Sequence, residues 1–454
     1  METIRTANTN ASEPNSPWEN LQDTPESKFN EIIKDLDTAK VTVYERLNAS
    51  NDKAAKAEFL ENPSLVHPRN EYGNLDESEV RENFATLARV EQSLQDSGLS
   101  DKRQRLIRLV ADDYKKKNEF LAANLAYNSA TTDEEKSRAA EWHHQANEAL
   151  YGKADEATFR TLMKEQISAI NRDSLSEDDK KQYDWLISEV GNLDTKTECF
   201  KPRPETVARF SELTQSYFAN FLKHIPDDRD TFTPTEMVNI INEIADTEFG
   251  GDDITYRAII DPKAANASTN HEARVIKFPE DAEYTRKRLG ALIVHEFGTH
   301  TMRAVPYLNQ DIKAFASELP GNETIDEGIA KCVEQALGGK YEDSGIDHYL
   351  NIGLATFEGK NFREVYNIQK TLKHLTGKSD KTVLNAVQRC FRGTGELVNN
   401  KDLAYYNGAN QVWQYIESHL DDPELFDNLF LTGKINFLDP AQESLSYEMR
   451  TSGL

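Results

Sequence analysis

Apolar residues recur every three to four positions through the first part of the chain, which is the period of an amphipathic α-helix. The pattern predicts packed helices from Phe29 to about Ile187. Before them, the chain is rich in Asn, Ser, Thr, Pro and Glu and offers little to bury, and two prolines in residues 193–204 interrupt the periodicity. We therefore expect three parts: a disordered tail (1–25), a helical N-terminal region (26–200) and a C-terminal region (201–454).

The C-terminal region adds a small β element to further helices. Residues 204–225 and 233–250 have helical periodicity, whereas residues 253–261 and 271–279 alternate β-branched or aromatic residues with polar ones, as strands do. A further helix should begin at Pro279, where acidic residues fill the first turn. The predicted fold class is mainly α (α+β), with a small β element.

Residues 289–303, LGALIVHEFGTHTMR, place two histidines and a carboxylate in an apolar helical segment. His295, Glu296 and His300 spell H-E-x-x-x-H, one residue longer than the H-E-x-x-H motif whose histidines bind zinc beside a glutamate base. On a regular α-helix, residues five apart differ by roughly 140°, so the histidines would point to different sides. We therefore predict a π-bulge, or a helix that loosens at Gly298, which directs both histidines to one ion.

A buried core helix is the alternative explanation of this segment, because a single histidine among apolar residues is more often a hydrogen-bonded core residue than a ligand. Two histidines and a glutamate within six residues favour a metal site. Burying an unpaired carboxylate is costly, and a cation is the simplest compensation.

A catalytic zinc takes three protein ligands and keeps a fourth position for water, so one ligand remains to be found. The candidates are the downstream acids Glu318, Glu323, Asp326, Glu327 and Glu334. We favour Glu327, because it lies in a helical stretch and precedes Gly328, whose missing side chain would let the metal helix approach closely. On spacing alone, an exposed surface acid explains Glu327 equally well.

Composition limits the classes of partner and the compartment. The 53 basic and 78 acidic residues give a net charge of −25, which should repel nucleic acid and anionic lipid. The three cysteines are far apart and lack C-x-x-C spacing, which fits a reducing compartment. No apolar run approaches the roughly 20 residues that span a bilayer, and the N-terminus lacks the apolar core of a signal peptide. We expect a cytoplasmic protein that binds neither membranes nor nucleic acid.

Several short segments are characteristic. They are VHEFGTHTMR (294–303), IDEGIA (325–330), CFRGT (390–394), KDLAYYNG (401–408) and ALYG (149–152). Together they resemble elements of the tyrosine carboxypeptidase-like metallopeptidases, which include the microtubule-associated tyrosine carboxypeptidases, over roughly residues 30–430. The chain departs from the family pattern at Asp326, which replaces a glutamate, at Ile329, which replaces a leucine, and at Tyr406, where an aliphatic residue is commoner.

The resemblance implies that residues 201–454 form a zincin-like metallopeptidase region with a metal-binding helix pair. It implies that His295, His300 and Glu327 bind Zn²⁺ and that Glu296 is the catalytic base. The activity that it implies is that of a carboxypeptidase, which removes a C-terminal residue from a peptide or protein, with an aromatic residue such as tyrosine as the candidate.

A carboxypeptidase also needs a cation for the terminal carboxylate of its substrate. We expect Arg392 and Lys401 to supply it, with Arg303 and Arg389 as second choices. Tyr405 should donate a hydrogen bond to the oxyanion or to the substrate backbone, although an aromatic core residue explains it as well. The predicted strand pair would offer an edge for an extended peptide.

Two other functions stay open on the sequence. An endopeptidase or a small-substrate amide hydrolase could use the same zinc and Glu296 without a carboxylate clamp. A non-catalytic metal-binding scaffold is the third hypothesis, but a binding protein has no need of a general base beside its metal. The charge of −25 disfavours a very acidic substrate such as the tubulin tail, so we expect a different peptide or protein C-terminus.

Overall fold

Helices dominate the computed structural model, which describes residues 25–452 except 74, 249–255, 263, 265–266, 271–272 and 306–318. Of the described residues, 66% are helical and 4% are in strands, which confirms the mainly α fold class with a small β element. The predicted tail lies almost entirely outside the described residues. Among those residues, none of the helices combines the length and apolar character needed to cross a membrane.

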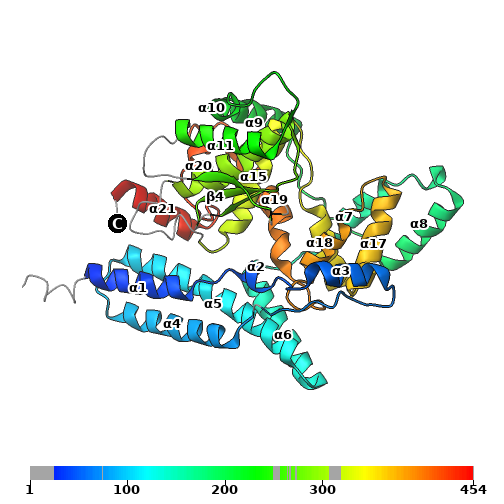
Figure 1. Cartoon of the computed structure of the whole chain (residues 1–454), viewed down its shortest axis with the longest axis horizontal. Helices are drawn as coiled ribbons and strands as arrows, with labels where there is room; N and C mark the ends of the chain where they lie inside the picture. Colours follow the sequence, from blue (N-terminus) through cyan, green and yellow to red (C-terminus); the bar gives the residue numbers. More distant parts are fainter. Residues whose placement is uncertain are drawn as a thin grey trace, which may run out of the picture.

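The N-terminal region forms eight α-helices, as its periodicity predicts. They are α1 (Pro25–Ala39), α2 (Val43–Arg46), α3 (Asp52–Glu61), α4 (Glu77–Gln95), α5 (Asp101–Ser129), α6 (Asp133–Tyr151), α7 (Glu156–Ser168) and α8 (Glu177–Glu189). Thr132 and Glu135 start α6 with a capping box, in which each side chain bonds the backbone N–H of the other residue. Figure 1 shows α1, α4, α5 and α6 along one side of the molecule, while α7 and α8 lie beside α17 and α18.

The next part of the chain contains three helices and two short sheets. The helices are α9 (Pro204–Tyr217), α10 (Ala219–Leu222) and α11 (Pro234–Glu248). One sheet has the order β2 (Arg257–Ile260), β4 (Val275–Phe278), β3 (Ser268–Asn270), with β2 parallel and β3 antiparallel to β4. The other pairs β1 (Thr231–Phe232) with β5 (Tyr284–Thr285). β2 and β4 fall within the two predicted strands, of which residues 253–255 and 271–272 lie outside the described part.

The predicted start of the motif helix at Pro279 is wrong. Residues after Pro279 turn and then form β5, which pairs with β1, and helix α12 begins only at Arg286 (Arg286–Leu292). The Thr285 hydroxyl caps this helix by accepting a hydrogen bond from the Arg288 amide at 3.2 Å. The acidic residues in positions 280–283 therefore belong to the turn, and the helix has no acidic residue in its first turn.

The remaining chain is again helical. Its elements are the π-helix η3 (Ile293–Thr301), α13 (Met302–Ala304), α15 (Asn322–Leu337), α16 (Ile346–Phe357), α17 (Phe362–Leu375), α18 (Val383–Cys390), the 3₁₀-helix η5 (Asn400–Asp402), α19 (Leu403–Ser418), α20 (Leu425–Phe430) and α21 (Pro440–Ser452). One core cluster joins α1, α4 and α5 to α9, the sheets, η3, α15 and α19. A second joins α7 and α8 to α16, α17 and α18, so both cores cross residue 200. The boundary between domains at residue 200 therefore remains a prediction from the sequence.

Helices α15 and α19 cross at two glycines. A methyl group at Gly328 would overlap the carbonyl of Gly408, and a methyl group at Gly408 would overlap the carbonyl oxygen of Thr324. The prediction that Gly328 admits the metal helix is therefore wrong, because its close neighbour is α19. The crossing fixes α15, which carries Glu327, against the helix that begins just after Lys401.

We expect Gly408→Ala to lower the free energy of unfolding by about 3 kcal/mol, because the added methyl meets rigid backbone atoms. The matched control is Gly290→Ala in α12, where a methyl would make ordinary contacts of 3.6 Å with Leu222 and 3.7 Å with Ile225. The control should be neutral or gain up to about 1 kcal/mol from helix propensity. Urea unfolding of both variants checks this, and equal stabilities would contradict it.

Candidate active site

The H-E-x-x-x-H motif lies on a π-helix, which confirms the predicted π-bulge. Two hydroxyls reinforce the wider turn by bonding carbonyls five residues earlier in the chain. Thr299 Oγ1 donates to Val294 O at 2.9 Å, and Thr301 Oγ1 donates to Glu296 O at 3.1 Å. Because residues five apart are nearly co-facial in such a turn, the motif can present both histidines on one side.

Gly298 allows this helix to pack closely. A methyl group there would lie 2.7 Å from Cε1 of Phe218, which is fully buried. The glycine therefore lets η3 approach the buried ring of Phe218 closely. The rings of His295 and His300 lie with their centroids 5.0 Å apart.

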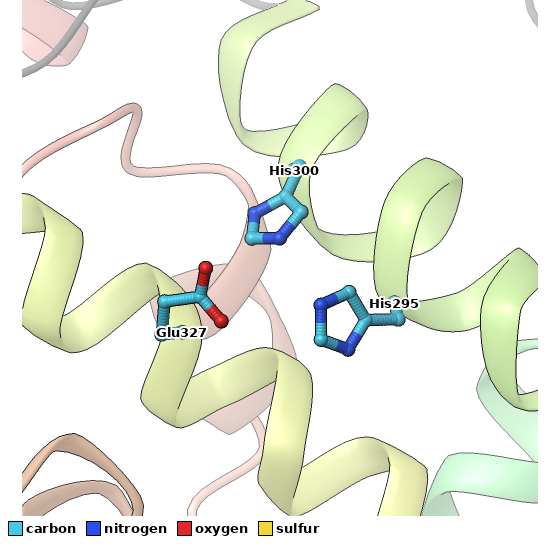
Figure 2. Close-up of side chains that lie close together, drawn as sticks. All are labelled: His295, His300 and Glu327. Atoms are coloured by element: carbon cyan, nitrogen blue, oxygen red, sulfur yellow. The ribbon is translucent and has the colours of Figure 1, made fainter. Parts of the chain in front are cut away.

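His295, His300 and Glu327 form the one group among the described residues that could hold a metal ion (Figure 2). Each offers a ligand atom, and these atoms all lie within 4.8 Å of one another. The histidines come from η3 and the glutamate from α15, and the three side chains point toward one another. Two imidazoles and one carboxylate form a donor set that suits zinc, so these residues fit the expected ion.

His300 is oriented by a buried carboxylate. Its Nδ1 lies 2.6 Å from Oδ2 of Asp326, which also accepts hydrogen bonds from Arg303 and Lys434. Burial would raise the pKa of Asp326, but the charges of Lys434, His300 and Arg303 outweigh burial and hold it well below its ordinary value. Asp326 is therefore ionised, and His300 donates from Nδ1, which leaves Nε2 for an ion.

His295 has a similar partner. Its Nδ1 lies 3.4 Å from Oε2 of Glu334, which also pairs with Arg288 and, at 2.8 Å, with Lys331. Burial opposes the ionisation of Glu334, but its interactions with His295 and Lys331 lower its pKa below the ordinary value. Both histidines thus hold a carboxylate on Nδ1, an arrangement that is common among zinc ligands.

Sequence reasoning considered Asp326 and Glu334 as zinc ligands and missed this supporting position. Helical geometry contained part of the signal. Asp326 is adjacent to Glu327 and so lies about 100° around the helix from it, whereas Glu334 follows Glu327 by nearly two full turns on the same face. Of the other candidates, Glu323 lines the cleft and pairs with Lys401, and Glu318 lies outside the described residues.

Glu296 lies beside the cluster in a cleft of about 1050 Å³, and it is 6% exposed. Thr269 of β3 donates to its carboxylate at 2.9 Å and to its backbone carbonyl at 3.2 Å. β3 therefore fixes the orientation of the predicted base. The same cleft is lined by Tyr44 and Glu45 of α2, so the N-terminal region contributes one of its walls.

The predicted substrate-binding cations occupy different places. Lys401 and Arg389 line the cleft, whereas Arg392 is not among the lining residues and its guanidinium stacks 4.3 Å from the centre of the Tyr44 ring. Arg303, a second choice, is fully buried against Asp326. Lys401 pairs with Glu323. Burial would lower the Lys401 pKa, but the interactions with Glu323, Tyr151, Tyr405 and Asp402 together outweigh burial and raise it, so the lysine is charged.

Tyr405 also lines the cleft. Its hydroxyl accepts a hydrogen bond from Arg389 at 3.0 Å, so its own hydrogen remains free to donate. The charge of Glu327, followed by burial, raises the pKa of Tyr405 and keeps the hydroxyl protonated at neutral pH. Arg389 in turn pairs with Asp402 at 2.6 Å.

Fold and site together define a mainly helical protein with a two-histidine, one-glutamate cluster beside a further glutamate in a wide cleft. The chain matches the model of the microtubule-associated tyrosine carboxypeptidase family over residues 195–443, more than half of its length, and it belongs to that family. The resemblance inferred from the motifs is thereby confirmed. No curated protein and no solved structure matches the chain. Helices α1–α8 lie outside the matched residues.

We expect Asp326→Asn to weaken zinc binding at the cluster about 10- to 100-fold, because the amide no longer fixes His300 with a charged acceptor. Asp402→Asn is the control, since Asp402 is equally buried and ion-paired but bonds Arg389 instead. Competition with a chromogenic chelator measures both affinities. Equal losses of zinc affinity in the two variants would contradict the prediction, because removal of any buried charge would then weaken binding.

Proposed function

We propose that this protein is a zinc-dependent carboxypeptidase that hydrolyses the C-terminal peptide bond of a peptide or protein and releases an aromatic residue such as tyrosine. The observation that carries the proposal is the convergence of His295, His300 and Glu327 beside Glu296 in one cleft. Membership of a tyrosine carboxypeptidase family supports the direction of cleavage and the leaving residue.

The chain supplies the ligands and the base of this reaction. His295, His300 and Glu327 would hold the zinc, which when bound supplies Lewis acidity and lowers the pKa of water. Glu296, oriented by Thr269, takes the proton from the attacking water and returns it to the leaving amine. The Tyr405 hydroxyl donates to the substrate carbonyl or backbone.

Arg389 and Lys401 are the cations that we place at the terminal carboxylate, because both line the cleft that contains the cluster. The planar fork of Arg389 suits a carboxylate, and its bond to Tyr405 connects the clamp to the reacting centre. Arg392, the other predicted residue, lies behind Tyr44, so we give it no direct contact with substrate.

Strand β3 offers a place for the substrate backbone. In the described part of the sheet, β3 has a neighbouring strand on one side, β4. Its residues line the cleft, and Thr269 connects it directly to Glu296. An extended peptide that paired with β3 would therefore run past the base, which is the β-augmentation mode of peptide binding.

The cleft is balanced in charge. Each basic side chain among its described lining residues has a carboxylate partner: Lys277 with Asp261, Arg288 and Lys331 with Glu334, Arg389 with Asp402, Lys401 with Glu323, and Lys434 with Asp326. Such a surface offers little attraction to a strongly acidic tail, and the net charge of −25 adds repulsion. We therefore propose a substrate whose C-terminal segment is neutral or basic.

The metal test uses two variants of the cluster and one of the adjacent Glu296. Wild type should contain about one zinc per chain, whereas His295→Ala and Glu327→Ala should lose it because each removes a ligand. Glu296→Gln should keep the metal and lose about 10²- to 10⁴-fold in kcat, because only the base is removed. Metal analysis and peptide hydrolysis measure these effects, with Glu212→Gln, at an exposed position of α9, as the control. A metal-free wild type would refute the proposal.

Cleavage direction is tested with matched peptides that end in tyrosine. A neutral peptide with a free carboxylate should lose one residue, whereas the same peptide with a C-terminal amide should be cleaved at least about 100-fold more slowly, because the charge that Arg389 and Lys401 bind is absent. An upstream run of glutamates should also slow cleavage, and added salt should reduce that difference. Equal cleavage of acid and amide, read by mass spectrometry, would indicate an endopeptidase.

A further inference from the structure

Helix α6 holds the segment that brings Lys401 to the cleft. Asn147 of α6 is 2% exposed and uses both ends of its amide on this segment. Its Nδ2 donates to the Val398 carbonyl at 3.0 Å, and its Oδ1 accepts from the Asn400 amide at 2.9 Å. A buried side chain that bonds a neighbouring backbone from both sides fixes the path of that backbone.

Other contacts from the same helical region support the attachment. The Asn400 side chain donates to the carbonyl of Gly152, which caps α6, at 2.7 Å. Asn128 of α5 donates to the Gly393 carbonyl at 2.8 Å. The segment between Gly393 and Asn400 is therefore anchored at both ends to α5 and α6.

The anchored backbone leads directly to the clamp. Asn400 is followed by Lys401, whose own amide is bound by the Asn399 side chain at 3.0 Å, and then by Asp402. Asp402 pairs with Arg389, which bonds Tyr405. A shift at Asn400 would thus move both cations that we place at the substrate carboxylate.

We propose that Asn147 is a positioning residue that sets the affinity for the terminal carboxylate of the substrate. The inference rests on the proposed function, since it concerns the clamp formed by Arg389 and Lys401. Asn147 precedes the residues matched to the family model. The N-terminal helices therefore take part in substrate recognition as well as in walling the cleft.

The test measures binding with catalysis removed. In the Glu296→Gln background, calorimetry compares a neutral tyrosine-ended tetrapeptide as free acid and as amide, and the ratio of the two dissociation constants reports the clamp. Adding Asn147→Leu, which keeps the volume but removes both hydrogen bonds, should reduce this preference for the free acid about tenfold and leave zinc content unchanged.

Asn118→Leu is the matched control. Asn118 is fully buried on α5 and bonds Asn83 of α4 at 2.9 Å and the Tyr114 carbonyl of its own helix at 2.8 Å. The Asn118→Leu variant should destabilise the same helical region but keep the preference for the free acid. If Asn147→Leu does not fold, the same ratio of dissociation constants is measured for Asn147→Asp. This variant retains the acceptor for the Asn400 amide and loses the donor to the Val398 carbonyl.

The experiment distinguishes a failure of the proposed clamp from a failure of the proposed role of Asn147. A parent Glu296→Gln protein that binds acid and amide equally would overturn the clamp and with it the proposed function. A parent that prefers the acid, with the same preference in the Asn147 variants, would overturn only the role of Asn147. The same loss in Asn118→Leu would also overturn it, because the effect would then follow from general destabilisation.

Discussion

The candidate site depends on the buried carboxylate of Asp326. It bonds His300 of η3, Arg303 just after η3, and Lys434. The end of the motif helix and the segment at Lys434 therefore both meet α15 at the two oxygens of Asp326. Arg303 and Lys434 are almost wholly buried, and buried cations of this kind are tolerated only when they are paired. The carboxylate thus links the packing of the segment that carries Lys434 to the orientation of His300.

Two different sets of contacts hold the parts of the candidate site in place. The cluster of His295, His300 and Glu327 lies on two helices, η3 and α15, and α15 packs closely against α19 through a contact between glycine backbones. The proposed clamp, in contrast, begins at the end of α18 and continues through a loop that the N-terminal helices hold in place. The proposed clamp and the histidine–glutamate cluster are therefore held by different parts of the chain.

The sequence predicted those features that arise from local patterns. Amphipathic periodicity predicted the helices and alternation predicted two strands. The five-residue spacing of His295 and His300 called for a π-bulge or a helix loosened at Gly298 if both were to meet one ion, and the structure has the π-helix. Glu327 followed from its helical setting and from resemblance, and the structure brings it to the histidines. Contacts between distant segments were not predictable in this way: the β1–β5 pairing that delays α12, the crossing of Gly328 with Gly408, and the pairing of Lys401 with Glu323 each join residues far apart in the chain.

The π-helix also separates the length of the motif from the geometry of the site. Its turn holds about one residue more than an α-helical turn, so it absorbs an extra residue between the histidines without reorienting the helix on either side. A single insertion or deletion at this point can therefore convert a five-residue motif into a six-residue one, or the reverse, while both imidazoles continue to face one ion. Searches keyed to the shorter spacing would pass over proteins in which the same ligand arrangement arises through this route.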